Sequence, residues 1–535
     1  MSNIYKFKYD SSEFVNMKKL GFSNNWPVVY LIEDGKEMYI GQTTSIYSRS
    51  RQHYNTPERQ RLENIHILHD EEYNLSAAYD IESLLIQYMA ADGVFRLQNS
   101  NHGLKGHNYF DREKYQAKFE DIWQELIKLG LAQKETLEIK NSDLFKYSPY
   151  KSLSSDQKFI ADRIYDELVH NYAGSLIING GPGTGKTILA TYLVKFLSED
   201  PKTSHLKIGL VVPMTSLRQT LKNVFKNIKG LKASMILGPA DVIKDKYDLL
   251  IVDESHRLKR RKNLTNFPSF DNVNKYLNLD SDSDELDWIR ASSKVQIFFY
   301  DKNQSVRPSD VRPEKFDELF AEELFLESQM RVGEGLIGGQ NYIEFVNKLF
   351  DNDLQNVNLD FRGYSFKSYN DLSRMVSDIK KLDNEYALCR IVSGYAWPWI
   401  SKTQPDEHDI VIGETKLKWN STNSNWVNSK NAINEVGCIH TVQGYDLNYA
   451  GVIIGPELGY DFSKKEFIIR SENYKDFNGR RGIDNPEELK GYILNIYKTL
   501  LTRSIKGTYV YIVDDGLRKY FEEALSVRHR EAIKI

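Results

Sequence analysis

One stretch of the chain, SLIINGGPGTGKTILATYLVKF over residues 175–196, constrains the fold more than any other. An apolar run that suits a buried strand leads into a glycine-rich segment, and a stretch with helical spacing of apolar residues follows at once. Glycines let backbone N–H groups approach a phosphate at the N-terminus of a helix. The stretch therefore predicts a P-loop, a phosphate-binding strand–loop–helix unit of an α/β sheet.

This loop carries the groups that hold a nucleoside triphosphate. The ammonium of Lys186 suits the β- and γ-phosphates, and the hydroxyl of Thr187 suits the shell of a bound Mg²⁺. The predicted nucleotide-binding residues of the loop are Gly180, Gly181, Pro182, Gly183, Thr184, Gly185, Lys186 and Thr187.

A second apolar run, residues 248–252, predicts a buried strand that ends at an acidic pair, Asp253 and Glu254. Ligands of open α/β sheets bind beyond the C-terminal ends of the strands. Asp253 is expected to hold Mg²⁺ through water, and Glu254 to deprotonate the water that attacks the γ-phosphate. Such a pair is common by chance, but the P-loop upstream makes it informative.

Beyond a polar stretch at 141–153, which predicts a linker, apolar runs alternate with amphipathic segments. The runs are SLIING, KIGLVV, DLLIVD, VQIFFYD and GVIIG. This alternation is typical of βα units around buried parallel strands, so we expect an α/β fold. A charged amphipathic helix is expected over 112–138, and a solvated loop over the acidic residues 280–287.

Composition limits the remaining classes of function. The 535 residues carry a formal net charge of −3, so any nucleic-acid surface must be local. Two cysteines, Cys389 and Cys438, are too few for a disulfide framework or a cysteine-based zinc site. The sequence has no signal-peptide pattern and no apolar run of membrane-spanning length, so we expect a cytoplasmic protein without a membrane partner.

Further motifs follow the P-loop in a fixed order: DESHRL, FFYDKNQSV, SQMRV, GCIHTVQGYDLNYAGVIIG and YKTLLTRSIKGTYVYIVD. Together they resemble motifs II to VI of superfamily 1 helicases. With the WPW element at 397–399, they are most similar to bacterial ATPases related to the helicase domain of Schlafen proteins. The resemblance covers about 151–520 and implies two RecA-like lobes with ATP between them.

The resemblance also implies roles for residues outside the P-loop. These are adenine contact by Gln157, γ-phosphate sensing by Gln304, arginine fingers at Arg331 and Arg503, and coupling of ATP to nucleic acid by Gln443 and Gly444. A guanidinium suits a finger because its charge is permanent and it can meet two phosphate oxygens at once.

The spacing of the motifs departs from that of unwinding helicases. Unwinding members of the superfamily carry large inserted subdomains, whereas here 66 residues separate Thr187 from Asp253 and 112 separate Arg331 from Gln443. The short spacing favours translocation, remodelling or an ATP-gated clamp over processive unwinding.

A second constellation lies in WPVVYLIEDGKEMYIGQTTSIYSRSRQHYN, residues 26–55. Two apolar runs around the turn EDGKE predict a hairpin with Tyr30 and Tyr39 on neighbouring strands. Arg49 and His53 are four apart and share one face of the helix expected after the hairpin. Glu82 lies among apolar residues of a further predicted helix, so it needs a partner or a metal.

These residues resemble the pattern of a GIY-YIG nuclease, here VVY, YIG, Arg49, His53, Glu82 and, less securely, Asn99. The resemblance implies one divalent cation, Mg²⁺, on Glu82, polarising the scissile phosphate. It also implies Tyr30 as the base for the attacking water and Arg49 as charge neutraliser. His53 and Tyr39 are expected to orient these groups.

The expected fold class is α/β, with a small α+β nuclease domain followed by two RecA-like lobes with parallel sheets. The expected segments are a nuclease domain at 1–140, a linker at 141–153, and lobes at 154–330 and 331–535.

Several other candidates carry less weight. The basic run 257–262, RLKRRK, suits either a phosphate track or a solvated face. Four tryptophans, Trp397, Trp399, Trp419 and Trp426, suit either base stacking or core packing. His440 lies in a motif that touches nucleic acid in the family.

The sequence thus predicts an ATP-dependent endonuclease with a helicase-like motor, acting on nucleic acid, DNA before RNA. A role in defence against foreign DNA or in repair is expected from the architecture alone. An alternative from another class is an ATP-switched nucleic-acid binder whose nuclease-like domain does not cut, and RNA as substrate stays open.

Overall fold

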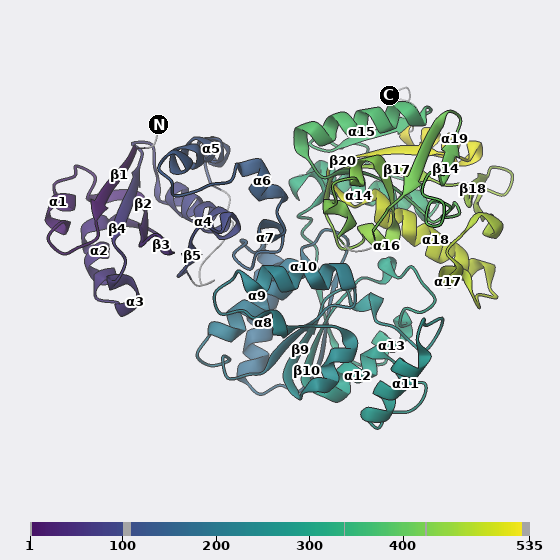
Figure 1. Cartoon of the computed structure of the whole chain (residues 1–535), viewed down its shortest axis with the longest axis horizontal. Coiled ribbons are helices and arrows are strands. Elements are labelled where there is room, and N and C mark those ends of the chain that lie inside the picture. The colour runs from purple at the N-terminus through teal and green to yellow at the C-terminus, as the bar shows by residue number, and fades with distance from the viewer. Residues whose placement is uncertain (1–2, 100–108, 336, 423–424, 527–535) are drawn as a thin grey trace. The chain divides into compact units, whose positions relative to one another are not determined.

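A computed structural model describes residues 3–99, 109–335, 337–422 and 425–526 (Figure 1). The chain divides into two compact units. The first comprises residues 1–171, 187–206 and 221–235, and the second comprises 172–186, 207–220 and 236–535.

The first unit contains a mixed five-stranded sheet in the order β1-β4-β2-β3-β5. Its strands are β1 (Asn3–Lys8), β2 (Asn24–Glu33), β3 (Glu37–Ser45), β4 (Asn64–His69) and β5 (Arg96–Leu97). Its helices are α1 (Phe14–Lys18), α2 (Ile46–Tyr54), α3 (Pro57–Gln60), α4 (Leu75–Asp92), α5 (Arg112–Lys128), α6 (Thr136–Asn141), α7 (Asp143–Lys146) and α8 (Ser155–Val169).

The predicted hairpin is confirmed as the antiparallel pair β2 and β3, in which Tyr30 lies opposite Gly41. Its turn follows from two residues: the Asp34 side chain accepts from two backbone N–H groups, and Gly35 adopts φ +80°, a conformation that favours glycine. Val28, Tyr30 and Ile32 alternate along β2, so they share the face that packs into one apolar cluster.

The second unit holds two larger sheets. The first, called the first lobe, is a six-stranded parallel sheet in the order β11-β6-β10-β9-β7-β8. Its strands are β6 (Gly174–Gly180), β7 (Ile208–Val211), β8 (Ile236–Leu237), β9 (Tyr247–Val252), β10 (Ser293–Tyr300) and β11 (Glu322–Leu326). Helices α9 (Lys186–Glu199) and α10 (Thr215–Lys226) begin in this unit, which also holds α11 (Phe267–Tyr276), α12 (Glu285–Ser292) and α13 (Pro313–Asp317).

The second lobe is built on a seven-stranded sheet in the order β12-β20-β17-β13-β16-β15-β14, parallel except for the β14–β15 pair. Its strands are β12 (Ser365–Tyr369), β13 (Cys389–Ser393), β14 (Ile410–Ile412), β15 (Thr415–Trp419), β16 (Glu435–Cys438), β17 (Leu447–Ile454) and β20 (Ser504–Ile512), and β18 (Leu458–Asp461) pairs with β19 (Glu466–Ile469). Its helices are α14 (Ile337–Phe350), α15 (Leu372–Tyr386), α16 (Ile439–Val442), α17 (Phe477–Arg480), α18 (Pro486–Leu501) and α19 (Asp515–Ser526).

Alternation along the central strands explains the layers of the second lobe (Figure 1). Ile453 packs with residues of α15 on one face, whereas Val452 and Ile454 pack with residues of α14, α18 and α19 on the other. Strands buried on both faces read as continuous apolar runs, as the sequence does. The expected α/β class is therefore confirmed, with two parallel sheets consistent with RecA-like lobes.

Two local expectations are wrong in detail. The helix predicted over 112–138 ends at Lys128 because Gly130 adopts φ +73°, a conformation that stops helices. A separate helix, α6, starts at Thr136. The acidic run 280–287 is not wholly a solvated loop, because Asp284 is buried and caps the start of α12.

The segment predicted as a linker, 141–153, is structured along part of its length. It contains α7, and Tyr147 and Tyr150 are buried. The helix start expected after it is confirmed: Ser154 and Gln157 form a capping box at the start of α8.

Candidate functional site

The P-loop joins β6 to α9 at the C-terminal edge of the first lobe. Gly183 and Gly185 adopt φ +81° and +77°, which only glycine reaches without strain. The ammonium of Lys186 donates to the carbonyl oxygens of Gly180, at 2.5 Å, and Gly181, at 2.9 Å. The buried ammonium of Lys186 therefore lies at the N-terminus of α9, the end of a helix where phosphates bind.

The acidic pair lies at the end of β9, in the middle of the same sheet. Asp253 is fully buried, and its carboxylate accepts from the Glu254 backbone N–H at 3.1 Å. Glu254 adopts φ 51°, a rare backbone conformation for a non-glycine residue. Its Oε2 lies 2.8 Å from Nε2 of His256.

A polar network runs from the P-loop of the first lobe to the second lobe. Oδ2 of Asp301 lies 3.8 Å from Nζ of Lys186 and accepts from the side-chain amide of Gln304 at 2.7 Å. The oxygen of that amide accepts from Nη2 of Arg503 at 3.5 Å. Arg503 is only 2% exposed, so its guanidinium is held inside the protein. The structure therefore brings together three of the residues singled out in the sequence.

The other predicted arginine finger is engaged with a carboxylate. Nε of Arg331 lies 2.5 Å from Oδ1 of Asp446. Gln443 is 1% exposed, and its Nε2 has no hydrogen-bond partner within the described ranges. Gly444 adopts φ +90°, and a β-carbon there would lie 3.2 Å from the Met214 side chain of the first lobe.

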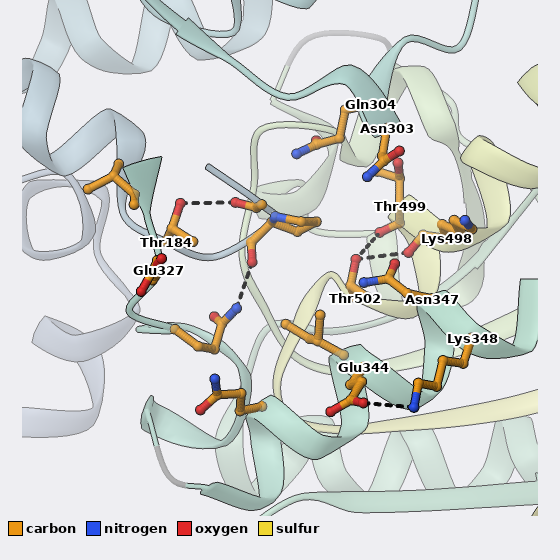
Figure 2. A pocket seen from close by; sticks show the side chains of 16 residues that line it. Thr184, Asn303, Gln304, Glu327, Glu344, Asn347, Lys348, Lys498, Thr499 and Thr502 are labelled. Atoms are coloured by element: carbon orange, nitrogen blue, oxygen red, sulfur yellow. Dashed lines mark hydrogen bonds and ion pairs between the residues drawn. The ribbon is translucent and has the colours of Figure 1, made fainter. Parts of the chain in front are cut away.

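A cavity of about 340 Å³ opens beside the P-loop. Figure 2 shows Thr184 and Glu327 on one side of it, Gln304 and Asn303 above, and Asn347, Lys348, Lys498, Thr499 and Thr502 on the other. The walls therefore come from both lobes. Two lysines line the cavity, Lys348 of α14, which pairs with Glu344, and Lys498 of α18, which pairs with Asp351.

The residues present fit Mg²⁺-ATP. Two glycines with positive φ keep side chains out of the loop. A β-carbon on Gly183, for example, would lie 2.1 Å from Oε1 of Gln329 and would clash with it. An ammonium, a buried acidic pair and a buried guanidinium supply the charges that such a ligand needs. Within the second unit, Lys186 would hold the phosphates and Asp253 the cation.

The sequence did not single out Gln329, which links the P-loop to the segment between the lobes. Its Nε2 donates to the Pro182 carbonyl at 2.7 Å, and its Oε1 accepts from the backbone N–H of Arg331 at 2.9 Å. Its position two residues before the predicted finger was the only signal in the sequence. Lys498 and Thr502, in the helical turn before Arg503, were missed in the same way.

Gln157 and Thr187 belong to the first unit. The Gln157 side chain accepts from the Ser154 backbone N–H at 3.1 Å, closing the capping box of α8. Thr187 is the second residue of α9, directly after Lys186. Their predicted roles toward the nucleotide stay predictions.

In the first unit, four of the predicted nuclease residues converge on the hairpin. Oη of Tyr30 lies 2.7 Å from Nε2 of His53 and accepts from Nε of Arg49 at 3.4 Å. The Tyr39 ring lies 4.7 Å from the imidazole of His53 and 6.3 Å from the Tyr30 ring. Gly41 makes this possible, because a β-carbon there would lie 2.4 Å from Oη of Tyr30.

Glu82 lies on α4 and is half-buried. Burial raises the pKa of its carboxyl to about 7, although the charge of Arg49 and a backbone hydrogen bond from Gln42 oppose this shift. Asn99 hydrogen-bonds to the backbone. Its amide exchanges two hydrogen bonds with the backbone of Ile40, so it fixes the strand that carries YIG.

Comparison with known proteins identifies a family for the larger part of the chain. A family model described as Schlafen group 3, DNA/RNA helicase domain, matches residues 174–514, more than half of the chain. The chain belongs to this family. An uncharacterised protein of Saccharomyces cerevisiae is 27% identical over 422 residues, which cover 69% of this chain and 90% of that protein.

Two solved structures are weakly similar to the chain. The arterivirus helicase, nonstructural protein 10, is 12% identical with a TM-score of 0.30, covering 66% of this chain and 64% of its own. The Pif1 helicase from Candida albicans is 11% identical with a TM-score of 0.30, covering 72% and 100%. The family assignment rests on the Schlafen helicase-domain match alone.

In this Schlafen helicase domain, two candidate nucleic-acid surfaces are partly buried or paired within the protein. Trp419 and Trp426 are 1% and 0% exposed and pack into the core, so they offer no face for base stacking. Only Trp397 and Trp399 are half-buried. In the basic run, the guanidinium groups pair internally: Arg257 with Asp310, Arg260 with the Pro308 carbonyl, and Arg261 with Asp271.

The structure also describes the surroundings of His440, the helices and the two cysteines. His440 lies 2.8 Å from the carboxylate of Asp476, so its imidazole has a partner within the protein. No helix within the described ranges is long and apolar enough to cross a membrane. Cys389 and Cys438 are both free and buried.

Proposed function

We propose that the protein is an ATP-dependent nuclease, in which a Schlafen-type helicase domain drives a metal-dependent phosphodiesterase carried by the first unit. The helicase domain would act on nucleic acid with ATP. The first unit would cut the nucleic acid, and ATP hydrolysis would be coupled to this cutting. DNA is the proposed substrate, and defence or repair the proposed setting.

The observation that carries the nuclease proposal is the set of contacts at Tyr30. Arg49 of α2 donates to its hydroxyl, and Nε2 of His53 on the same helix lies within hydrogen-bond distance of it. Gly41 leaves the space that the Tyr30 ring occupies. Burial, and after it Tyr39, raises the pKa of Tyr30 above its ordinary value, and the hydrogen bond and charge of Arg49 oppose this rise. Arg49 is therefore the contact that would favour the phenolate which a base for water requires. Glu82 would hold the Mg²⁺ that polarises the phosphate and stabilises the leaving oxygen.

At the ATP site, a network of contacts runs from Lys186 through Asp301 and Gln304 to Arg503, and so joins residues of both lobes. This network supports a hydrolysis cycle in which both lobes take part. The guanidiniums of Arg331 and Arg503 would neutralise the charge that develops on the γ-phosphate. Arg331 would first leave Asp446, which makes this carboxylate a competitor of the nucleotide. Gln443 and Gly444 would couple this change to the nucleic acid.

A cleavage assay on the full chain tests the proposal. Single-stranded, duplex, forked and RNA substrates are incubated with Mg²⁺ or Mn²⁺, with and without ATP. Cutting that depends on the metal and disappears in Tyr30→Phe, which keeps the ring and its packing, is the expected result. Full ATPase activity without cutting of any substrate would instead favour the ATP-switched nucleic-acid binder.

A further inference from the structure

We propose that Arg59 is a positioning residue of the proposed nuclease site and holds His53 in the tautomer that donates its hydrogen bond to Tyr30. The inference rests on the proposed function for its catalytic meaning. Its structural content, the state of the imidazole, can be measured separately.

Arg59 lies on the short helix α3, which follows the helix that carries Arg49 and His53. Its guanidinium stacks over the Tyr39 ring, 3.8 Å from the ring centre. Its Nη1 is in direct contact with Nδ1 of His53. Among the described residues, no carboxylate lies within ion-pair distance of Arg59, so the imidazole and the phenol ring are its partners.

The contact decides which nitrogen of His53 carries the proton. A guanidinium has only donors, so Nδ1 of His53 must accept. A neutral imidazole carries a single N–H, which is therefore on Nε2. Because Nε2 lies 2.7 Å from Oη of Tyr30, this N–H donates to the phenol oxygen.

The alternative of a doubly protonated imidazole is opposed by the surroundings of His53. The ring is buried, and the guanidiniums of Arg59 and Arg49 both repel a positive charge on it. Burial and these two charges lower the pKa of His53 to about 3. Donation from Arg59 is thus compatible only with the neutral Nε2–H form.

The tautomer has a direct consequence for Tyr30. Its oxygen accepts from both His53 and Arg49, so its own proton points away from both of them. His53 cannot take the phenol proton while Arg59 occupies Nδ1. Arg59 therefore makes His53 a donor that supports negative charge on Tyr30, and excludes it as the base for the phenol.

The backbone keeps Arg59 within reach. The Thr56 N–H donates to the His53 carbonyl at 2.9 Å, and Pro57 begins α3. Pro at the first position of a helix has a preset φ, so the turn between the two helices is rigid. Arg61, two residues further on, instead pairs with Glu37 on the surface. It provides a matched control on the same segment.

The first test is spectroscopic and uses the full chain labelled with ¹⁵N-histidine. Long-range ¹H–¹⁵N spectra distinguish the two tautomers, and the His53 signals are assigned by their absence in His53→Gln. The expected result at pH 7 is a protonated Nε2 and an unprotonated Nδ1. A protonated Nδ1 in the wild type would overturn the inference.

The second test compares Arg59→Ala, Arg59→Lys and Arg61→Ala. Arg59→Ala should change the His53 tautomer signals and slow cutting by about 10- to 100-fold, the usual cost of losing a partner that orients a catalytic group. Arg59→Lys keeps a donor and should recover both readouts in part, while Arg61→Ala should leave both unchanged. Wild-type signals and cutting in Arg59→Ala would contradict the proposal.

The two readouts separate the two hypotheses. If the wild type cuts no nucleic acid, the proposed nuclease function fails, and the spectra of wild type and Arg59→Ala alone support or overturn the assignment of the tautomer. If it cuts and the spectra show the other tautomer, only the role of Arg59 fails.

Discussion

At the scale of single residues, Glu254 shows how the helicase domain sets the charge of a buried acid. Burial opposes ionisation of this carboxyl. The charges of His256, Lys186 and Arg503 outweigh that effect and hold its pKa well below the ordinary value. Glu254 is thus an anion at neutral pH.

Glu254→Gln should bind ATP but hydrolyse it at least about 100-fold more slowly, because the amide can orient the water yet cannot take its proton. Phosphate release and binding of a fluorescent ATP analogue measure the two effects. Glu314→Gln, an exposed substitution on α13, serves as control. Hydrolysis within about threefold of wild type would exclude Glu254 as the base.

A second buried acid, Glu457, makes stability depend on pH. It is 1% exposed, Oη of Tyr497 donates to its Oε1 at 2.5 Å, and its Oε2 has no hydrogen-bond partner among the described residues. Burial raises its pKa to about 7, against the hydrogen bond from Tyr497. The folded chain therefore binds a proton that the unfolded chain has released, between about pH 4.5 and 7.

Stability from this group is present below pH 4.5 and is lost as the pH rises through 7. Glu457→Gln should leave the melting temperature unchanged at pH 5 and raise it at pH 8. The free energy of unfolding at pH 8 should rise by at most about 3 kcal/mol. Melting curves of both proteins across this range provide the measurement. A constant difference between them at all pH values would contradict the assignment.

At the scale of elements, the hairpin β2–β3 depends on one small residue. A β-carbon on Gly41 would lie 2.4 Å from Oη and 2.6 Å from Cζ of Tyr30. Gly41→Ala should displace the ring, cost about 1–3 kcal/mol and reduce cutting. Gly21→Ala, where no atom lies within 4 Å of the added carbon, should change neither the melting temperature nor cutting. Equal behaviour of the two variants would refute the packing argument.

The elements also show what the sequence can predict. Strands such as β9 and β17 could be predicted because burial on both faces leaves an unbroken apolar run. The hairpin could be predicted because its turn residues are specific. The β14–β15 pair could not, since its residues mix polar and apolar types without a turn signal as strong as EDGKE.

For the candidate site, motif residues could be predicted because they stand at fixed positions after strands. Asp301 and Gln329 could not be, because their roles come from contacts between distant segments. Arg59 is a similar case: its guanidinium reaches His53 and Tyr39 only after two helices and a hairpin have folded. The burial of Trp419 and Trp426 is equally a property of packing.

At the scale of the whole molecule, the two proposed activities lie in different compact units. Tyr30, His53 and Glu82 belong to the first, and Lys186 and Glu254 to the second. The predicted Mg²⁺ ligands also differ, Glu82 for the nuclease and Asp253 for the P-loop. The activities should therefore be separable by substitution.

Glu82→Ala should abolish cutting and leave ATP hydrolysis intact, because it removes the only side-chain carboxylate proposed for the nuclease cation. Lys186→Ala should abolish ATP hydrolysis, since the loop loses the charge that compensates the phosphates. Lys207→Ala, which removes a surface lysine paired with Asp245, is the control for the latter.

The decisive measurement is cutting by Lys186→Ala with ATP present. If ATP hydrolysis drives the nuclease, this variant should cut no faster than wild type does without ATP, although its Tyr30 and Glu82 are untouched. Cutting by Lys186→Ala at the ATP-stimulated wild-type rate would show that the two units work independently. Loss of ATP hydrolysis in Glu82→Ala would show instead that this residue supports the fold, because the proposed ligand of the nuclease cation has no direct part in phosphate chemistry at the P-loop.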